Sequence, residues 1–151
     1  MTDEKQDRTQ EERGAFRPQQ GQFVVRGAGR ILWEWLQGTK KPPYEALFEG
    51  VAGCGKTRAV AEFIRTVCRN YPTSSVLVLR RTRVDLAKSF LKIWENEVLG
   101  PNHPAVLGGP SREHRMVYRH PLLGGEVVVA GMEDPTRVFS TQYDLIFWNE
   151  A

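Results

Sequence analysis

The chain has 151 residues, 40% of them hydrophobic and 26% charged, with a formal net charge of +3 at pH 7. This is the composition of an ordinary globular protein with room for one domain, which excludes a fibrous or wholly disordered chain. No apolar run approaches the roughly 20 residues that cross a bilayer, and the first residues lack the apolar core of a secretory signal, so we expect a cytoplasmic protein without a membrane partner.

The amino-terminal part divides into a tail and a first helix. Residues 1–22 are polar and mixed in charge, which predicts a disordered tail, and we expect residues 23–151 to form the domain. A short amphipathic helix is predicted within residues 23–38, where apolar side chains recur at helical spacing at Ile31, Leu32, Trp35 and Leu36. Trp33 lies beside this stripe, and we expect it to pack in the core rather than to contact DNA or a base.

A strand, a glycine-rich loop and a helix are predicted next. Residues 44–50 are typical of a short strand that leads directly into the loop. Residues 57–71 form an amphipathic pattern, with an apolar face of Val60, Phe63, Ile64, Val67 and Tyr71. Residues 74–80 are a nearly continuous apolar run, which predicts a strand covered on both faces. A second amphipathic helix is predicted over residues 83–98.

The carboxyl-terminal third predicts short strands. Residues 114–120 and 125–131 alternate in polarity around a turn, which indicates a hairpin. Residues 145–148 read LIFW and predict another buried strand. Because apolar strands alternate with amphipathic helices, we predict an α/β fold: a parallel sheet flanked by helices, with a small β-hairpin insertion. Ligands of such sheets bind beyond the carboxyl ends of the strands.

The segment before the first long helix fits the phosphate-loop pattern GxxxxGK[ST] at every fixed position. It reads GVAGCGKT and comprises Gly50, Val51, Ala52, Gly53, Cys54, Gly55, Lys56 and Thr57. Glycines let successive backbone N–H groups turn toward phosphate oxygens at the positive end of the following helix. Lys56 is predicted to reach the β- and γ-phosphates and the Thr57 hydroxyl to bind Mg²⁺, so ATP and Mg²⁺ are the expected ligands. Arg58 is grouped with these nucleotide-binding residues.

The end of the last predicted strand supplies a second chemical motif. Four bulky apolar residues are followed by Asn149 and Glu150. In ATPases with this arrangement the acidic side chain polarises the attacking water, which makes Glu150 a catalytic candidate together with Lys56. Asn149 takes the position of an aspartate that holds the Mg²⁺ hydration shell. The alternative is a buried strand followed by an Asn-Glu pair that starts a helix.

Other polar residues are weaker candidates. Arg80 ends a predicted strand, and Arg81 and Arg83 follow it. All three are candidates for DNA-phosphate contacts or for an arginine finger, the alternative being a solvated entrance to a helix. The histidines have no metal-like spacing, so surface positions are expected for His103, His114 and His120. The two cysteines, Cys54 and Cys68, are expected to be reduced thiols.

Over about residues 44–151 the chain resembles the ATPase domain of the large terminase subunit of tailed bacteriophages. The segments that carry the resemblance are GVAGCGKT, VLRRTRVDLAKSF and GMEDPTRVFSTQYDLIFWNEA. Within them, a strand ends in an arginine, Ser89 lies in the next helix, and the acidic strand is preceded by Gly131, Asp134 and Pro135. The resemblance implies a P-loop NTPase of the additional-strand type.

The same resemblance implies ATP hydrolysis that drives double-stranded DNA into a capsid, in the host cytoplasm during virion assembly. The implied partners are a small terminase subunit, the portal protein and further copies of the chain in a ring. Relatives continue with later sheet strands and a nuclease domain, so we expect this ATPase domain to be incomplete at its carboxyl end. Two alternatives stay open: a superfamily 1 or 2 helicase-type ATPase, and a module that binds ATP without hydrolysing it.

Overall fold

The protein is an α/β fold built on a four-stranded mixed sheet. The computed structural model describes residues 29–43, 45–49, 53–139 and 141–149. The strands are β1 (Ser75–Arg80), β2 (Val117–Tyr118), β3 (Glu126–Gly131) and β4 (Leu145–Trp148). Their order across the sheet is β2-β3-β1-β4, with β1 parallel to both β3 and β4, and β2 antiparallel to β3. The α/β class is therefore confirmed, and the sheet is mixed, because the strands of the predicted hairpin, β2 and β3, belong to the same sheet as the parallel strands.

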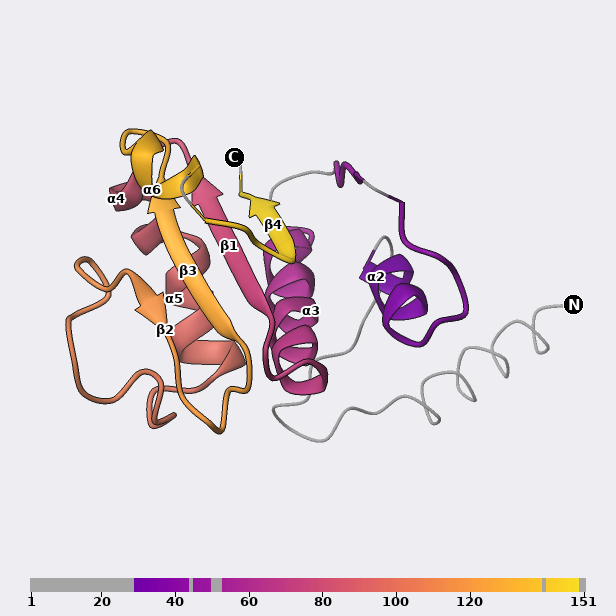
Figure 1. The fold of residues 1–151 in the computed structure, drawn as a ribbon, viewed down its shortest axis with the longest axis horizontal. Coiled ribbons are helices and arrows are strands. Elements are labelled where there is room, and N and C mark those ends of the chain that lie inside the picture. The colour runs from indigo at the N-terminus through magenta and orange to yellow at the C-terminus, as the bar shows by residue number, and fades with distance from the viewer. Residues whose placement is uncertain (1–28, 44, 50–52, 140, 150–151) are drawn as a thin grey trace, which may run out of the picture.

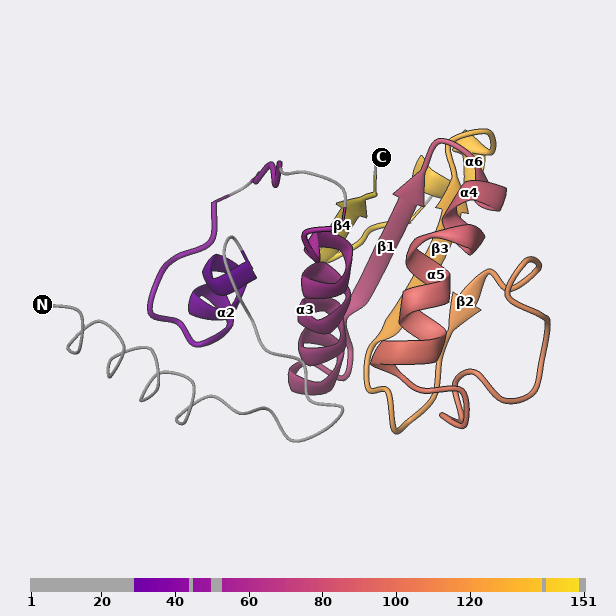
Figure 2. The same ribbon diagram turned by 180° about the vertical axis from the view of Figure 1, so that it is seen from behind.

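The helices are distributed unequally over the two faces of the sheet. The helices are α2 (Gly29–Leu36), α3 (Lys56–Asn70), α4 (Arg83–Lys88), α5 (Phe90–Ile93), a π-helical turn η1 (Trp94–Val98) and α6 (Pro135–Phe139). Figure 1 and Figure 2 show α3, α4 and α5 on one face, α6 near the top of β3, and α2 beside α3. No helix in the described ranges is long and apolar enough to span a membrane.

The main core lies between the sheet and the helices α3, α4 and α5. Its aromatic centre is Phe90, whose ring stacks on Trp94 at 5.9 Å between centroids and lies 5.8 Å from the ring of Phe147 on β4. Trp94 also meets Tyr118 of β2 edge-on at 6.3 Å. All of β1 except its two ends is buried, as the apolar run predicts. Because these large rings pack against one another between the helices and the sheet, they determine how the helices are oriented on the sheet.

The predicted helix over residues 83–98 forms, but it is interrupted. Thr82 begins it, because its hydroxyl accepts a hydrogen bond from the backbone N–H of Asp85 at 3.1 Å. At Ser89 the backbone leaves the helical region, with φ −109° and ψ −93°, so α4 and α5 are separate segments. The last turn is a π-helix, closed by the Leu99 N–H on the Trp94 carbonyl at 2.9 Å. Amphipathic spacing predicted the burial of this segment but not its break.

The strand predicted before the loop is not seen in its described residues, and the predicted hairpin forms but is not an insertion. Residues 45–49, which were expected to form the strand before the loop, have no regular structure, and Leu47 is 82% exposed. Among the strands that the structure describes, none pairs with this segment. The predicted hairpin exists as β2 and β3, but it is not an insertion, because β3 also pairs with β1 along six residues. Hairpin signals report the local turn and say nothing about the second neighbour of a strand.

β4 is less buried than its apolar sequence predicts. Leu145 and Phe147 pack against the main core, whereas Ile146 and Trp148 point to the opposite face and are 57% and 52% exposed. In the described part of the chain β4 pairs only with β1. That opposite face carries a smaller core of Leu77, Leu79, Ala130 and Val138, which does not extend to β4.

Candidate nucleotide site

The described part of the phosphate loop leads directly into α3. Gly53 and Gly55 have φ of 77° and 84°, in the left-handed region that the loop requires and that glycine adopts without strain. α3 begins at Lys56, and no described side chain caps its amino end. This amino end of α3 is the positive end of the helix dipole, which favours an anion. Gly50, Val51 and Ala52 lie outside the described residues.

The polar side chains of the loop have different surroundings. The Lys56 ammonium group lies 3.5 Å from the sulfur of Cys54, which is exposed. Thr57 is half-buried in the first turn of α3. Arg58 turns toward carboxylates: its Nη2 and Nε lie 2.7 and 2.9 Å from Glu62, and its Nη1 forms an ion pair with Glu97. Arg58 thus ties α3 to the π-helical turn, and nothing in these contacts places its guanidinium at the loop.

The second motif lies at the same end of the molecule. Figure 1 and Figure 2 show the amino end of α3 near β4, on the side of the molecule toward which the carboxyl ends of β1 and β4 point. Asn149 directly follows β4, is only 6% exposed, and extends the ladder through its backbone N–H to the Leu79 carbonyl at 2.7 Å. The structure therefore brings Asn149 to the strand ends where the sequence predicts chemistry. Glu150 lies outside the described residues.

A network of side chains connects the ends of β1 and β4. Arg80, the last residue of β1, donates through Nη1 to the Ser89 hydroxyl oxygen at 2.6 Å. The Asn149 side-chain amide donates to the same oxygen at 3.3 Å. The Ser89 hydroxyl in turn donates to the Asp85 carbonyl at 2.7 Å. The sequence identified Ser89 only through a resemblance. A local sign was also present, because a serine hydroxyl within a helix can donate to the carbonyl four residues earlier, here that of Asp85, and so bend the helix.

The other two arginines of the predicted cluster differ from Arg80. Arg83 donates through Nη2 to the carbonyls of Arg112, at 2.7 Å, and Arg115, and its backbone N–H bonds Glu133 at 3.0 Å. Burial lowers the pKa of Arg83 below its ordinary value. Arg83 therefore anchors the loop before β2, whereas Arg81 is exposed.

Mg²⁺ would have to be held by oxygen atoms at this end of the molecule. The hydroxyl of Thr57 and the carboxamide oxygen of Asn149 are oxygen donors of the kind Mg²⁺ accepts, directly or through water. Within the described ranges no three His, Cys, Asp or Glu side chains group together as a metal site. Mg²⁺ commonly keeps several waters and takes further ligands from the phosphates of a bound nucleotide.

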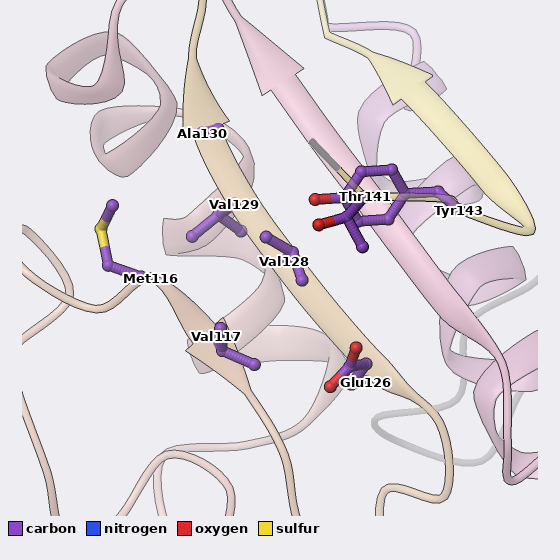
Figure 3. A pocket seen from close by; sticks show the side chains of 8 residues that line it. All are labelled: Met116, Val117, Glu126, Val128, Val129, Ala130, Thr141 and Tyr143. Atoms are coloured by element: carbon purple, nitrogen blue, oxygen red, sulfur yellow. The ribbon is translucent and has the colours of Figure 1, made fainter. Parts of the chain in front are cut away.

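Two shallow hollows among the described residues lie away from the loop. One, of about 280 Å³, opens between β2, β3 and the segment before β4, with Val117, Val128 and Tyr143 in its wall and Glu126 at its edge (Figure 3). The other, of about 380 Å³, borders α4 and α5 beside Lys88, Lys92, Arg112 and Glu113. Neither contains a residue of the predicted nucleotide site.

The histidines and cysteines are only partly as expected. His114 is exposed, but His103 and His120 are half-buried with their rings edge-on at 6.4 Å between centroids. Burial, followed by the charges of Arg65 and His120, lowers the pKa of His103. Both cysteines are free thiols. Burial raises the pKa of the Cys68 thiol to about 11, so it is unreactive in the folded protein.

A polar cluster that no sequence pattern predicted lies buried beside the core. The Glu95 carboxylate, 6% exposed, accepts from the Tyr118 hydroxyl at 2.5 Å and from Arg112 Nε at 2.9 Å. Arg115, buried among backbone carbonyls, donates to those of Ala105, Val106 and Gly108 and lies over the Tyr118 ring. These contacts hold the loop before β2 against the helices. They join residues distant in sequence, so no local pattern predicts them.

Comparison with models of known protein families, with curated proteins and with solved structures finds no match for this chain.

Proposed function

We propose that this chain binds ATP with Mg²⁺ at residues 50–57 and hydrolyses it, as the motor part of a terminase large subunit that packages double-stranded DNA. The observation that carries the proposal is the complete phosphate-loop pattern, which ends in the first turn of a 15-residue amphipathic helix. Gly53 and Gly55 have the left-handed backbone that such a loop needs, and Lys56 is the first helical residue. These features support phosphate binding by backbone N–H groups and one lysine.

The DNA-packaging part of the proposal rests on the resemblance of three separate segments to terminases. Two of these segments contribute to one network, because Arg80 and Ser89 come from the second segment and Asn149 from the third. A motor of this kind would work as a ring on double-stranded DNA, with the portal and a small terminase subunit, in the host cytoplasm. Glu150, the next residue after Asn149, is the proposed base that activates water.

A second candidate function is ATP binding without hydrolysis, and Asn149 favours it. A carboxamide adds no negative charge to a Mg²⁺ site, and its amide group is already engaged with Ser89. Phosphate release in the presence of Mg²⁺ separates the two functions. Stimulation of that release by double-stranded DNA would support the packaging motor over a module that only binds ATP.

The exposed thiol of Cys54 offers a direct test of nucleotide binding at the loop. MgATP should slow the reaction of Cys54 with a thiol reagent by at least fivefold, because bound phosphates and the closed loop would shield the sulfur. AMP, which lacks the β- and γ-phosphates, should protect much less. Cys68 is buried and serves as an internal control that reacts only on unfolding. A Cys54→Ser variant identifies the fast-reacting thiol.

Lys56→Ala should abolish both the protection of Cys54 and calorimetric ATP binding, because the phosphates lose the loop's cation. The matched control is Lys92→Ala, which removes an exposed lysine from α5 and should leave ATP binding unchanged. Circular dichroism of both variants checks the fold. Wild-type affinity in Lys56→Ala, or a Cys54 rate that MgATP does not change, would refute nucleotide binding at this loop.

A further inference from the structure

The Ser89 hydroxyl is the meeting point of three elements. It lies at the break between α4 and α5, and it contacts the last residue of β1 and the first residue after β4. The non-helical backbone of Ser89 places its side chain there. A serine that only filled a helix surface would need none of these contacts.

The number of hydrogen bonds that the Ser89 hydroxyl can donate and accept determines how Asn149 is oriented. A hydroxyl has one proton to donate and two lone pairs to accept with. Arg80 can only donate, and it occupies one lone pair at 2.6 Å. The proton goes to the Asp85 carbonyl, which at 2.7 Å is much closer than Asn149 at 3.3 Å. Ser89 can therefore only accept from Asn149, so the Asn149 NH₂ group faces Ser89 and its carbonyl oxygen lies on the other branch of the carboxamide.

The Asn149 side chain has little other freedom. The residue is 6% exposed, and its backbone is fixed by the hydrogen bond from its N–H to the Leu79 carbonyl. A rotated carboxamide would place two acceptor oxygens against each other unless Ser89 gave up its bond to Asp85. An aspartate at position 149 would meet the same conflict, because an ionised carboxylate has no proton to donate to Ser89.

We propose that Ser89 is a positioning residue that holds the Asn149 carboxamide with its oxygen turned away from Ser89. In this orientation the oxygen can accept a hydrogen bond from a Mg²⁺-bound water. Ser89 also links Asn149 to Arg80. The role in Mg²⁺ binding rests on the proposed ATPase function. The orientation of Asn149 rests on the hydrogen bonds alone. Ser89 acts through Asn149 and does not itself contact nucleotide.

The contact can be tested by unfolding in urea, which does not depend on activity. Ser89→Ala and Asn149→Ala should each raise the equilibrium constant of unfolding by about tenfold, since each removes a partner from a buried network. The double variant should raise it by clearly less than the hundredfold product, because the same bond cannot be lost twice. Ser111→Ala removes an exposed hydroxyl, which hydrogen-bonds the exposed side chains of His114 and Glu113, and serves as the matched control. Multiplicative effects of the two substitutions would overturn the proposal.

The function of the contact is tested by the Mg²⁺ requirement for phosphate release. Ser89→Ala should raise the Mg²⁺ concentration at half-maximal rate severalfold, leave ATP affinity measured in EDTA within twofold, and have no further effect in the Asn149→Ala background. An unchanged Mg²⁺ midpoint, or a shift that adds to that of Asn149→Ala, would overturn the positioning role. If the wild-type chain binds ATP but releases no phosphate, hydrolysis is refuted, and the unfolding measurement still decides whether Ser89 orients Asn149.

Discussion

Replacing Tyr118 by phenylalanine removes a single hydroxyl from the buried polar cluster and leaves the ring in place. Tyr118 is fully buried, and its hydroxyl donates to the Glu95 carboxylate at 2.5 Å. Burial and the hydrogen bond to Glu95 raise the pKa of Tyr118 above its ordinary value, so the hydroxyl keeps its proton at any pH at which the protein is studied. The other carboxylate oxygen of Glu95 keeps its bond to Arg112 at 2.9 Å.

The expected cost follows from these contacts. Hydrogen bonds to charged groups contribute about 1.5–3 kcal/mol, and water cannot replace the lost donor at a buried site. Because Arg112 still neutralises Glu95, the larger loss of about 3–5 kcal/mol that accompanies a broken buried ion pair does not apply. Tyr118→Phe should therefore lower the free energy of unfolding by about 2 kcal/mol, which is roughly a thirtyfold change in the unfolding equilibrium.

The assay is urea denaturation at pH 7 of Tyr118→Phe and of a matched variant, Tyr71→Phe. Tyr71 is 61% exposed, so loss of its hydroxyl should change the free energy of unfolding by no more than about 0.5 kcal/mol. The denaturant slope should be the same in both, since neither change alters the surface buried on folding. Equal shifts for the two variants would show that the Tyr118–Glu95 bond contributes nothing beyond an exposed hydroxyl.

Three further predictions concern catalysis, pH and backbone geometry. Glu150→Gln should leave ATP affinity within a few fold but lower phosphate release by roughly 10² or more, and an equal loss of binding would instead indicate a metal or structural role. The pKa of His103 is lowered in the folded protein, so as the pH falls the unfolded state binds this proton before the folded state does. The free energy of unfolding should therefore fall as the pH drops below about 6.5, and His103→Gln should reduce this fall in urea melts at different pH values. Gly124→Ala should lower the free energy of unfolding more than Gly100→Ala. Both glycines have φ near +90°, but of the two only Gly124 would place the new Cβ 2.2 Å from a backbone oxygen, that of Cys68. Equal losses of unfolding free energy in urea would contradict this.

The sequence determined those elements whose pattern is local and strong. β1 is an apolar run, α3 has a helical apolar stripe, and both form within one or two residues of the predicted bounds. Gly53 and Gly55 were predicted to need glycine and have the left-handed backbone that only glycine adopts readily. The strand at residues 145–148 was also predicted correctly, because four bulky apolar residues between polar ones favour a short strand.

Only the tertiary structure decided how these elements associate. An apolar strand sequence is the same whether one face or both are covered, so the exposure of Ile146 and Trp148 on β4 could not be read from it. The hairpin signal did not show that β3 would lie beside β1 in the centre of the sheet. The region before the loop shows the converse: residues 45–49 were expected to belong to a strand, but they have no regular structure.

Within the candidate site, too, the sequence determined some features and only the tertiary structure decided others. The sequence identified Arg80 and Asn149 because each lies at the end of a strand, but it could not show that one hydroxyl, that of Ser89, accepts from both. It also grouped Arg80 with Arg83, whereas the fold directs Arg83 toward backbone carbonyls of the loop before β2. Residue type and spacing determine what a side chain can do chemically. Which partner it meets depends on strand order and on the break between α4 and α5, because these bring together residues that are 60 positions apart in the chain.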